Sequence, residues 1–339
     1  QLFNANVALL SIMLCLITLG FYVYPQLLLA EVFWLFLIMA FFERFVSFLK
    51  TGASSSLWLA GLLLGISVLI KPMALLYIFF LIPVLLFYKK NNTKPIQNCL
   101  ILIISFYLPI ISYMSYNYYR YNTFALAPMT ELNIYQCFLS KVIAHVDRVP
   151  VQHVLENQLA FKGAHSFDSS GWNDAKALFY TYAIAHPWAC VRVWGTNVVK
   201  TLVGLYSTQL KLLLNPSIKG GDHSFFKVSG TIPQRISGYI TQGTSSKTVQ
   251  IIAALETLWS IIRWLLVLIA FFILLKKKQY MLCWLFGSFI AQSAFVTGMD
   301  GCCRYRIMFE PFLVILTAVS IMSIYKWIKH KHTSFVCER

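Results

Sequence analysis

Two arginines, Arg304 and Arg306, stand at the start of a long apolar run in the stretch MDGCCRYRIMFEPFLVILTAV. A guanidinium group presents a planar fork of N–H donors that matches the oxygens of a phosphate. The run behind the arginines is long enough to enter a bilayer. The start of a helix carries unpaired N–H groups and partial positive charge, which disfavours cations unless an anion arrives. The pattern therefore predicts a phosphate-binding site at the start of the last apolar segment.

The same residues allow a second interpretation, in which the arginines are neutralised within the chain. Asp300 and Glu310 flank them, and Arg306 and Glu310 are four residues apart, which places both on one helix face. The sequence leaves the phosphate site and the internal ion pairs both open.

Further ionisable residues fall at the ends of apolar segments. Lys71 precedes Pro72 and is either a second phosphate cation or a snorkelling lysine at a helix break. Glu31 opens an apolar segment and is either a site residue or an acid stabilised by the helix dipole. Arg120 ends SYNYYR, an aromatic stretch that suits an interfacial belt or a sugar platform. The candidates that would support the phosphate site are Glu31, Arg120, Asp300 and Tyr305.

The composition predicts whether these residues lie in water or in a lipid bilayer. Of the 339 residues, 58% are hydrophobic and only 12% are charged, and the mean hydropathy is +0.68. These values are typical of an all-α polytopic membrane protein, because lipid offers the backbone no hydrogen-bond partners. About eight segments are apolar enough to span, at residues 5–22, 28–48, 56–70, 73–88, 96–114, 249–275, 281–297 and 307–327.

The basic residues predict the orientation of these segments. The net charge of +16 comes largely from lysines and arginines at alternate segment ends, which the positive-inside rule places in the cytoplasm, so nucleic acid is not the expected partner. The expected domains are residues 1–115 with five spans, 116–249 as an α-rich extracytoplasmic domain, 250–328 with three spans, and 329–339 as a cytoplasmic tail.

Residues 190–214 are apolar enough to suggest a ninth span, but a crossing there would put the later lysines outside. Arg192, Lys200 and Lys211 interrupt the segment, which predicts an amphipathic helix on the membrane or docked on the bundle, with Val191, Trp194, Val198, Leu202 and Leu205 on its apolar face. A helix from about residue 173 to 186 should precede it, and residues 215–234 should form a loop.

Several kinds of chemistry lack a motif. The sequence contains no D-x-D, G-x-G-x-x-G or P-loop pattern for a nucleotide, and the spacing of His145, Asp147, His153 and Glu156 fits no standard metal site. We therefore expect no metal and no cofactor. Cys137 and Cys190 could form a disulfide if their segment is extracytoplasmic, which the sequence does not decide.

Five stretches resemble the GT-C glycosyltransferases, in particular the bacterial branch related to dolichyl-phosphate-mannose protein mannosyltransferases and aminoarabinose transferases. They are YPQLLLAEVFWLFLIMAFF, LWLAGLLLGISVLIKPMALLYIFFLIPVLLF, YNYYRYNTFAL, AIAHPWACVRVW and CRYRIMFEPFLVILTAVSI. Together they cover nearly the whole chain in the family's order. The resemblance implies a sugar donor carried on a polyprenyl phosphate, bound from the outer leaflet, and transfer to a glycolipid, glycan or protein acceptor. By motif it places the donor phosphate near Arg304 and Arg306, with Lys71.

The resemblance also implies that the chain is truncated. The family's catalytic carboxylate lies in the first extracytoplasmic loop, which nothing here matches, so it is expected upstream of Gln1. A lipid-linked sugar transporter or flippase, an O-antigen polymerase or ligase, and an inactive remnant are the alternatives. A bacterial inner membrane with a cytoplasmic C-terminus is the expected location.

Overall fold

Every regular element is a helix in the part of the chain that the computed structural model describes, residues 3–25, 30–87, 94–122, 124–126, 137–157, 169–215, 225–226 and 228–337. The long helices and the short ones between them are α1 (Ala5–Ile17), α2 (Gly20–Val23), α3 (Glu31–Thr51), α4 (Ser54–Ile70), η2 (Pro72–Leu76), α5 (Tyr77–Phe87), α6 (Pro95–Tyr121), α15 (Lys247–Lys276), α16 (Tyr280–Thr297), η4 (Cys303–Met308) and α17 (Glu310–Cys337). The remaining helices are α8 (Ser140–Asp147), α9 (Val151–Asn157), α11 (Ser169–Ala185), α12 (Pro187–Val203), α13 (Ser207–Leu214) and α14 (Ile232–Thr241).

Five of the described helices are long and apolar enough to cross a membrane: α3, α6, α15, α16 and the Glu310–Lys329 part of α17. Three shorter apolar helices, α1, α4 and the Pro72–Phe87 pair η2–α5, account for the other expected segments. The chain is thus a helical protein of membrane character. Each of the eight expected apolar segments is mostly helical over its described length, with non-helical residues at Thr18–Leu19, Ala30 and Phe309.

Local chemistry sets several helix boundaries. The side chain of Asn4 accepts a hydrogen bond from Val7 N at 3.0 Å and caps α1. Gly52 ends α3 in the left-handed region, at φ 73°. Pro72 ends α4, because the residue before a proline is forced out of the helical region, and Lys71 is extended at φ −145° and ψ 117°. The expected break at Pro72 is confirmed.

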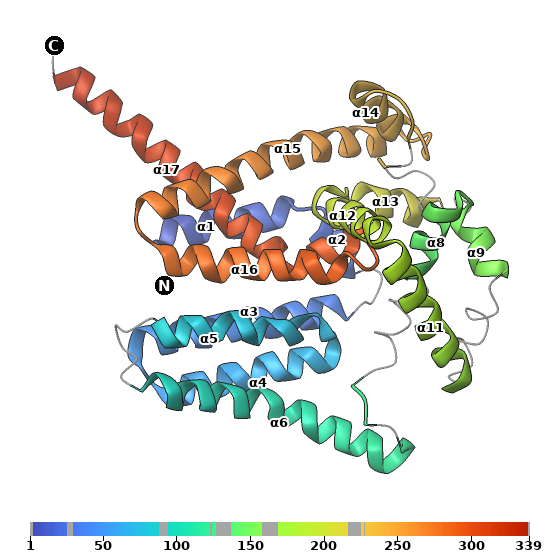
Figure 1. Ribbon diagram of the computed structural model, residues 1–339. Helices are drawn as coiled ribbons and strands as arrows, with labels where there is room; N and C mark the ends of the chain where they lie inside the picture. Colours follow the sequence, from blue (N-terminus) through green and yellow to red (C-terminus); the bar gives the residue numbers. More distant parts are fainter. Residues whose placement is uncertain are drawn as a thin grey trace.

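The long helices form two groups that meet through aromatic side chains. One group contains α3, α4, α5 and α6, and the other contains α1, α15, α16 and α17 (Figure 1). Phe42 of α3 lies 4.6 Å from Phe312 of α17, measured between ring centroids, and Tyr77 of α5 donates a hydrogen bond to Leu285 O of α16 at 2.8 Å. The two groups therefore share one core.

The two ends of the bundle differ in what they carry (Figure 1). The helices α8, α9 and α11–α14 gather at one end, together with the starts of α3, α15 and α17; we call it the capped end. The α3–α4 and α15–α16 turns lie at the opposite end, which bears Lys50 and Lys276–Lys278; we call it the lysine end. The ends thus differ in that helices cover the capped end, whereas the lysine end is formed by helix turns.

Several sequence expectations need correction at the domain edges. Helix α6 continues to Tyr121, beyond residue 115, and α17 continues to Cys337, so residues 329–337 are helical. Residues 190–214 contain two helices, α12 and α13, separated at Gly204–Tyr206. The end of the expected loop forms the first turn of α14, where Thr231 and Gln234 make a capping box.

The docked interpretation of α12 holds, and its expected apolar face is right in part, because Trp194 and Leu202 pack against the core and Leu205 after the helix is buried. The buried positions are Val193, Asn197 and Thr201, whereas Val191 is exposed. Asn197 Nδ2 donates to Gly298 O at 3.0 Å and so fixes α12 to the residue that follows α16. The buried amide of Asn197 thus satisfies the Gly298 carbonyl and adds a polar contact that the apolar pattern of the sequence did not predict. The preceding helix, α11, ends at Ala185, close to the expected residue 186.

At Gly65, helix α4 packs directly against the backbone of α6, so we expect this position to be sensitive to mutation. A Cβ atom there would lie 2.3 Å from Phe106 O and 2.7 Å from Pro109 Cγ. Because two backbones would have to separate, we expect Gly65→Ala to lower the free energy of unfolding by about 1–3 kcal/mol, measured by thermal unfolding in detergent. The control is Gly195→Ala in α12, whose Cβ would meet nothing within 4 Å, and which should be neutral or slightly stabilising. Equal effects of the two substitutions would contradict the packing argument.

Candidate functional site

Three charged residues from distant parts of the sequence meet at the capped end. Glu31 Oε1 accepts a hydrogen bond from Lys71 Nζ at 2.5 Å and another from Arg304 Nε. The Glu31 side chain is fully buried, whereas 15% of the Lys71 side chain and 36% of the Arg304 side chain are exposed. Glu31 Oε2 is buried without a hydrogen-bond partner. We call these residues the Glu31 cluster.

The Glu31 cluster carries more positive than negative charge. Two cations share one carboxylate, so their sum is +1. Burial lowers the pKa of Lys71, and the nearby Glu31 offsets part of this effect. Burial also acts to lower the pKa of Arg304, but the hydrogen bond and charge of Glu31 outweigh it and leave the pKa raised. The partly exposed cations can still accept an anion.

The positions of the cluster residues follow from their local structure. Glu31 is the first residue of α3, where the helix dipole favours a carboxylate. Lys71 lies in the extended joint before Pro72, and Arg304 lies in the 3-10 helix η4. The sequence named all three as candidates, but their mutual contacts required the structure.

Of the other candidates, one is near the cluster and two lie elsewhere. Lys71 Nζ lies 5.5 Å from the centre of the Tyr305 ring. Asp300 Oδ1 lies 3.5 Å from Lys141 Nζ of α8, so this acid pairs outside the cluster. Arg120 is exposed in the last turn of α6, and no hydrogen bond or ion pair joins it to the three described residues of the Glu31 cluster.

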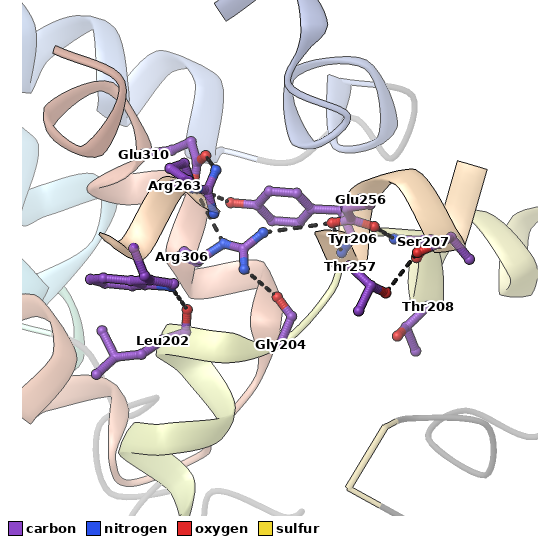
Figure 2. Close-up of polar contacts among 12 residues, drawn as sticks. Leu202, Gly204, Tyr206, Ser207, Thr208, Glu256, Thr257, Arg263, Arg306 and Glu310 are labelled. Atoms are coloured by element: carbon purple, nitrogen blue, oxygen red, sulfur yellow. Dashed lines mark hydrogen bonds and ion pairs between the residues drawn. The ribbon is translucent and has the colours of Figure 1, made fainter. Parts of the chain in front are cut away.

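Arg306 belongs to a different, fully buried group (Figure 2). Its Nη1 donates to Gly204 O, its Nε lies 3.3 Å from Glu310 Oε2, and its Nη2 lies 3.6 Å from Glu256 Oε1. The guanidinium carbon lies 4.1 Å from the centre of the Tyr206 ring. The expected i, i+4 pair of Arg306 with Glu310 is therefore present. These contacts pair Arg306 with acids and a carbonyl of the same chain, while its Nε makes no hydrogen bond.

The remaining members of this group lie on α15 and at the start of α13. Arg263 Nη1 binds Glu310 Oε1, and Tyr206 donates its hydroxyl to Glu310 Oε2 at 2.9 Å. Glu256 accepts from the backbone N–H groups of Tyr206 at 2.6 Å and Ser207 at 2.7 Å, which caps α13 (Figure 2). We call Tyr206, Glu256, Arg263, Arg306 and Glu310 the Arg306 network. Its two arginines and two glutamates sum to zero charge.

The geometry of η4 separates the two arginines that the sequence suggested as a pair. A 3-10 helix has three residues per turn, so side chains two positions apart point about 120° away from each other. Arg304 consequently faces α3 and the α4–η2 joint, and Arg306 faces α15 and the α12–α13 joint. The expectation of one shared phosphate site for both side chains is corrected to two separate clusters.

A cavity of about 570 Å³ opens beside the Arg306 network, between α1–α2 and α15. Its walls include Ile17, Leu255 and Leu258, which are also exposed on the outside of the bundle, and its lining contains Arg306 but neither Lys71 nor Arg304. It provides an apolar space next to η4.

Sequence reasoning missed Glu256 and Arg263. A single arginine within the apolar stretch LWSIIRWLLVLIAFF is expensive in lipid and points to a buried partner. Glu256 lies seven residues earlier, about two helical turns, and so shares its face. Those two observations could have identified the network.

Lys211 of α13 is a further buried cation outside the bundle helices. Its Nζ donates to Tyr239 O and to Gln242 O, the latter at 2.9 Å, and lies 4.3 Å from the centre of the Tyr239 ring. These carbonyls are at the end of α14, where positive charge is favourable. Burial lowers the pKa of Lys211 to about 8.

The lowered pKa of Lys211 predicts a pH dependence of stability. Between pH 8 and about 10.5 the unfolded chain binds more protons at this lysine than the folded chain, so the free energy of unfolding should rise with pH. Below pH 8 both states are protonated and the contribution is constant. We expect the melting temperature of the native chain to rise relative to Lys211→Met across this window, by an amount equivalent to roughly 1–3 kcal/mol. A difference that is flat with pH would contradict the prediction.

Both Cys137 and Cys190 are free thiols, so the structure contains no disulfide between them. Comparison with protein-family models, with curated proteins and with solved structures finds no match to this chain.

Proposed function

We propose that this chain acts in membrane glycosyl transfer, and that it binds a sugar donor carried on a polyprenyl phosphate. The observation that carries the proposal is the Glu31 cluster, in which two partly exposed cations share a single carboxylate. The surplus charge of +1 suits a phosphate at the rim of an apolar bundle.

The roles of the residues follow from this charge balance. Arg304 and Lys71 contact the donor phosphate, and Glu31 holds both cations at the rim. Arg306 is a positioning residue, because its network fixes η4 against α15 and the start of α13. We place the capped end on the extracytoplasmic side, since the lysine end carries the charges typical of the cytoplasmic side.

The reaction uses the phosphate as the leaving group. An acceptor hydroxyl attacks C1 of the sugar with inversion, the bond between C1 and the phosphate oxygen breaks, and the hydroxyl proton passes to a general base. The products are the glycosylated acceptor and a polyprenyl phosphate. Arg304 and Lys71 stabilise the charge that develops on the departing phosphate.

A binding experiment tests the donor site without requiring turnover. The purified chain in detergent is titrated with undecaprenyl phosphate and with undecaprenol, which differ only in the phosphate. We expect the phosphate to bind at least about tenfold more tightly, because charge-assisted hydrogen bonds contribute roughly 1.5–3 kcal/mol. Equal affinity for the two lipids would refute the proposed site. With a sugar-loaded donor and an acceptor, relocation of sugar without covalent transfer would indicate a transporter instead.

A further inference from the structure

A second cavity lies at the lysine end, far along the bundle from the Glu31 cluster. It has a volume of about 280 Å³ and is bounded by the start of α1, the end of α15 and α17. Its apolar walls include Val7, Leu274 and Val319, all of which are buried. Its polar rim contains Asn4, Lys277, Gln279, Ser323 and Lys326. An apolar pocket thus ends in a basic mouth.

Three sources of positive charge converge on this mouth. Lys277 and Lys326 are exposed, and the lining contains no acidic residue. The start of α1 also lies in the lining, with Asn4 as its cap and no acid in its first turn, so the partial charge of the helix adds to that of the lysines. The electrostatics favour an anion.

The position of the cavity decides which anion fits. The mouth lies where α15 ends at Lys276 and where Lys326 lies near the end of the apolar Glu310–Lys329 part of α17, the level at which a bilayer presents its head groups. Basic pockets between helices at such a level bind the head groups of anionic lipids, and the apolar walls would receive the first part of an acyl chain.

We propose that the cavity bounded by Asn4, Lys277 and Lys326 binds an anionic phospholipid, with its phosphate between the two lysines and an acyl chain against Val7 and Val319. This site does not depend on the proposed donor site, because the two lie at opposite ends of the bundle and share no residue.

The chain offers a matched control for surface charge. Lys276 is adjacent to Lys277, is also exposed and lies at the same end, but it is outside the cavity lining and its Nζ lies 5.1 Å from the centre of the Phe272 ring. A general attraction of the lysine end for anions would depend on Lys276 as much as on Lys277. A built site depends on Lys277 and Lys326.

The experiment measures binding of dioctanoyl phosphatidylglycerol to the full chain in neutral detergent, by the shift of its melting temperature. We expect the double variant Lys277→Gln with Lys326→Gln to weaken binding about 10- to 30-fold, because each lysine near an anionic lipid contributes about a factor of five to the affinity. The control Lys276→Gln should change the affinity less than about twofold. These exposed substitutions should not unfold the protein.

The outcomes separate the possible ligands. Equal losses for Lys276→Gln and for the single Lys277→Gln variant would overturn the site in favour of general surface charge. An equal shift with dioctanoyl phosphatidylcholine would overturn the requirement for a net negative head group. If inorganic phosphate at the same concentration shifts the melting temperature equally, the acyl chain contributes nothing and the ligand is not a lipid. A preference for phosphatidylglycerol that is weakened in Lys277→Gln, lost in the double variant and kept in Lys276→Gln supports the proposal.

Discussion

Glu310→Gln should lower the free energy of unfolding by about 3–5 kcal/mol, the expected effect of removing one partner from a buried ion pair. Glu310 is completely buried and holds Arg263, Arg306 and the hydroxyl of Tyr206. The substitution keeps the shape of the side chain but leaves two buried guanidinium groups with only Glu256 as counter-charge. Arg263 is affected most, since its Nε and Nη2 already lack hydrogen-bond partners. Denaturation in mixed micelles measures the loss.

A double-mutant cycle distinguishes this charge effect from simple damage to packing. Arg263→Met combined with Glu310→Gln removes one charge of each sign and leaves Arg306 with Glu256, so the network stays neutral. We expect the double variant to recover at least about 2 kcal/mol relative to the sum of the single losses. Glu43→Gln is the exposed control, since Glu43 pairs with Arg44 on the surface and should cost less than about 1 kcal/mol. Additive losses would show that Arg263 and Glu310 are not coupled.

The fold could be predicted from the sequence where one local rule dominates. Length and hydropathy marked the long helices, and Pro72 marked the break before η2. Lipid leaves a spanning backbone few alternatives to a helix, so composition alone is informative. The break at Gly204 was missed because it depends on tertiary contacts, among them the Gly204 carbonyl bound by Arg306.

The site could be predicted only as a set of residue types. Arg304, Lys71 and Glu31 were recognisable as charges at the ends of apolar segments, because such charges need partners. Which residues would meet depended on the 3-10 geometry of η4, which a hydropathy pattern does not encode. That geometry directs Arg304 toward Glu31 and Arg306 toward Glu310, although the two arginines are only two residues apart.

Arg304→Ala should weaken binding of undecaprenyl phosphate about 10- to 100-fold, which corresponds to the loss of one charge-assisted contact. The substitution reduces the charge of the Glu31 cluster from +1 to 0. Glu31 keeps its ion pair with Lys71 at 2.5 Å, so its buried carboxylate remains compensated and the fold should persist. Isothermal titration in detergent measures the affinity, and thermal unfolding of the same sample verifies the fold.

Two further substitutions make the Arg304 prediction specific. Arg304→Lys keeps the charge but removes the guanidinium fork, so its affinity should fall between those of the native chain and Arg304→Ala. Arg192→Ala removes an exposed arginine from α12, also at the capped end, and should bind like the native chain. If Arg192→Ala and Arg304→Ala weaken binding equally, the lipid responds only to the overall charge of the capped end. If neither weakens it, the phosphate lies elsewhere and the Glu31 cluster is an internal ion pair that joins α3 to η4.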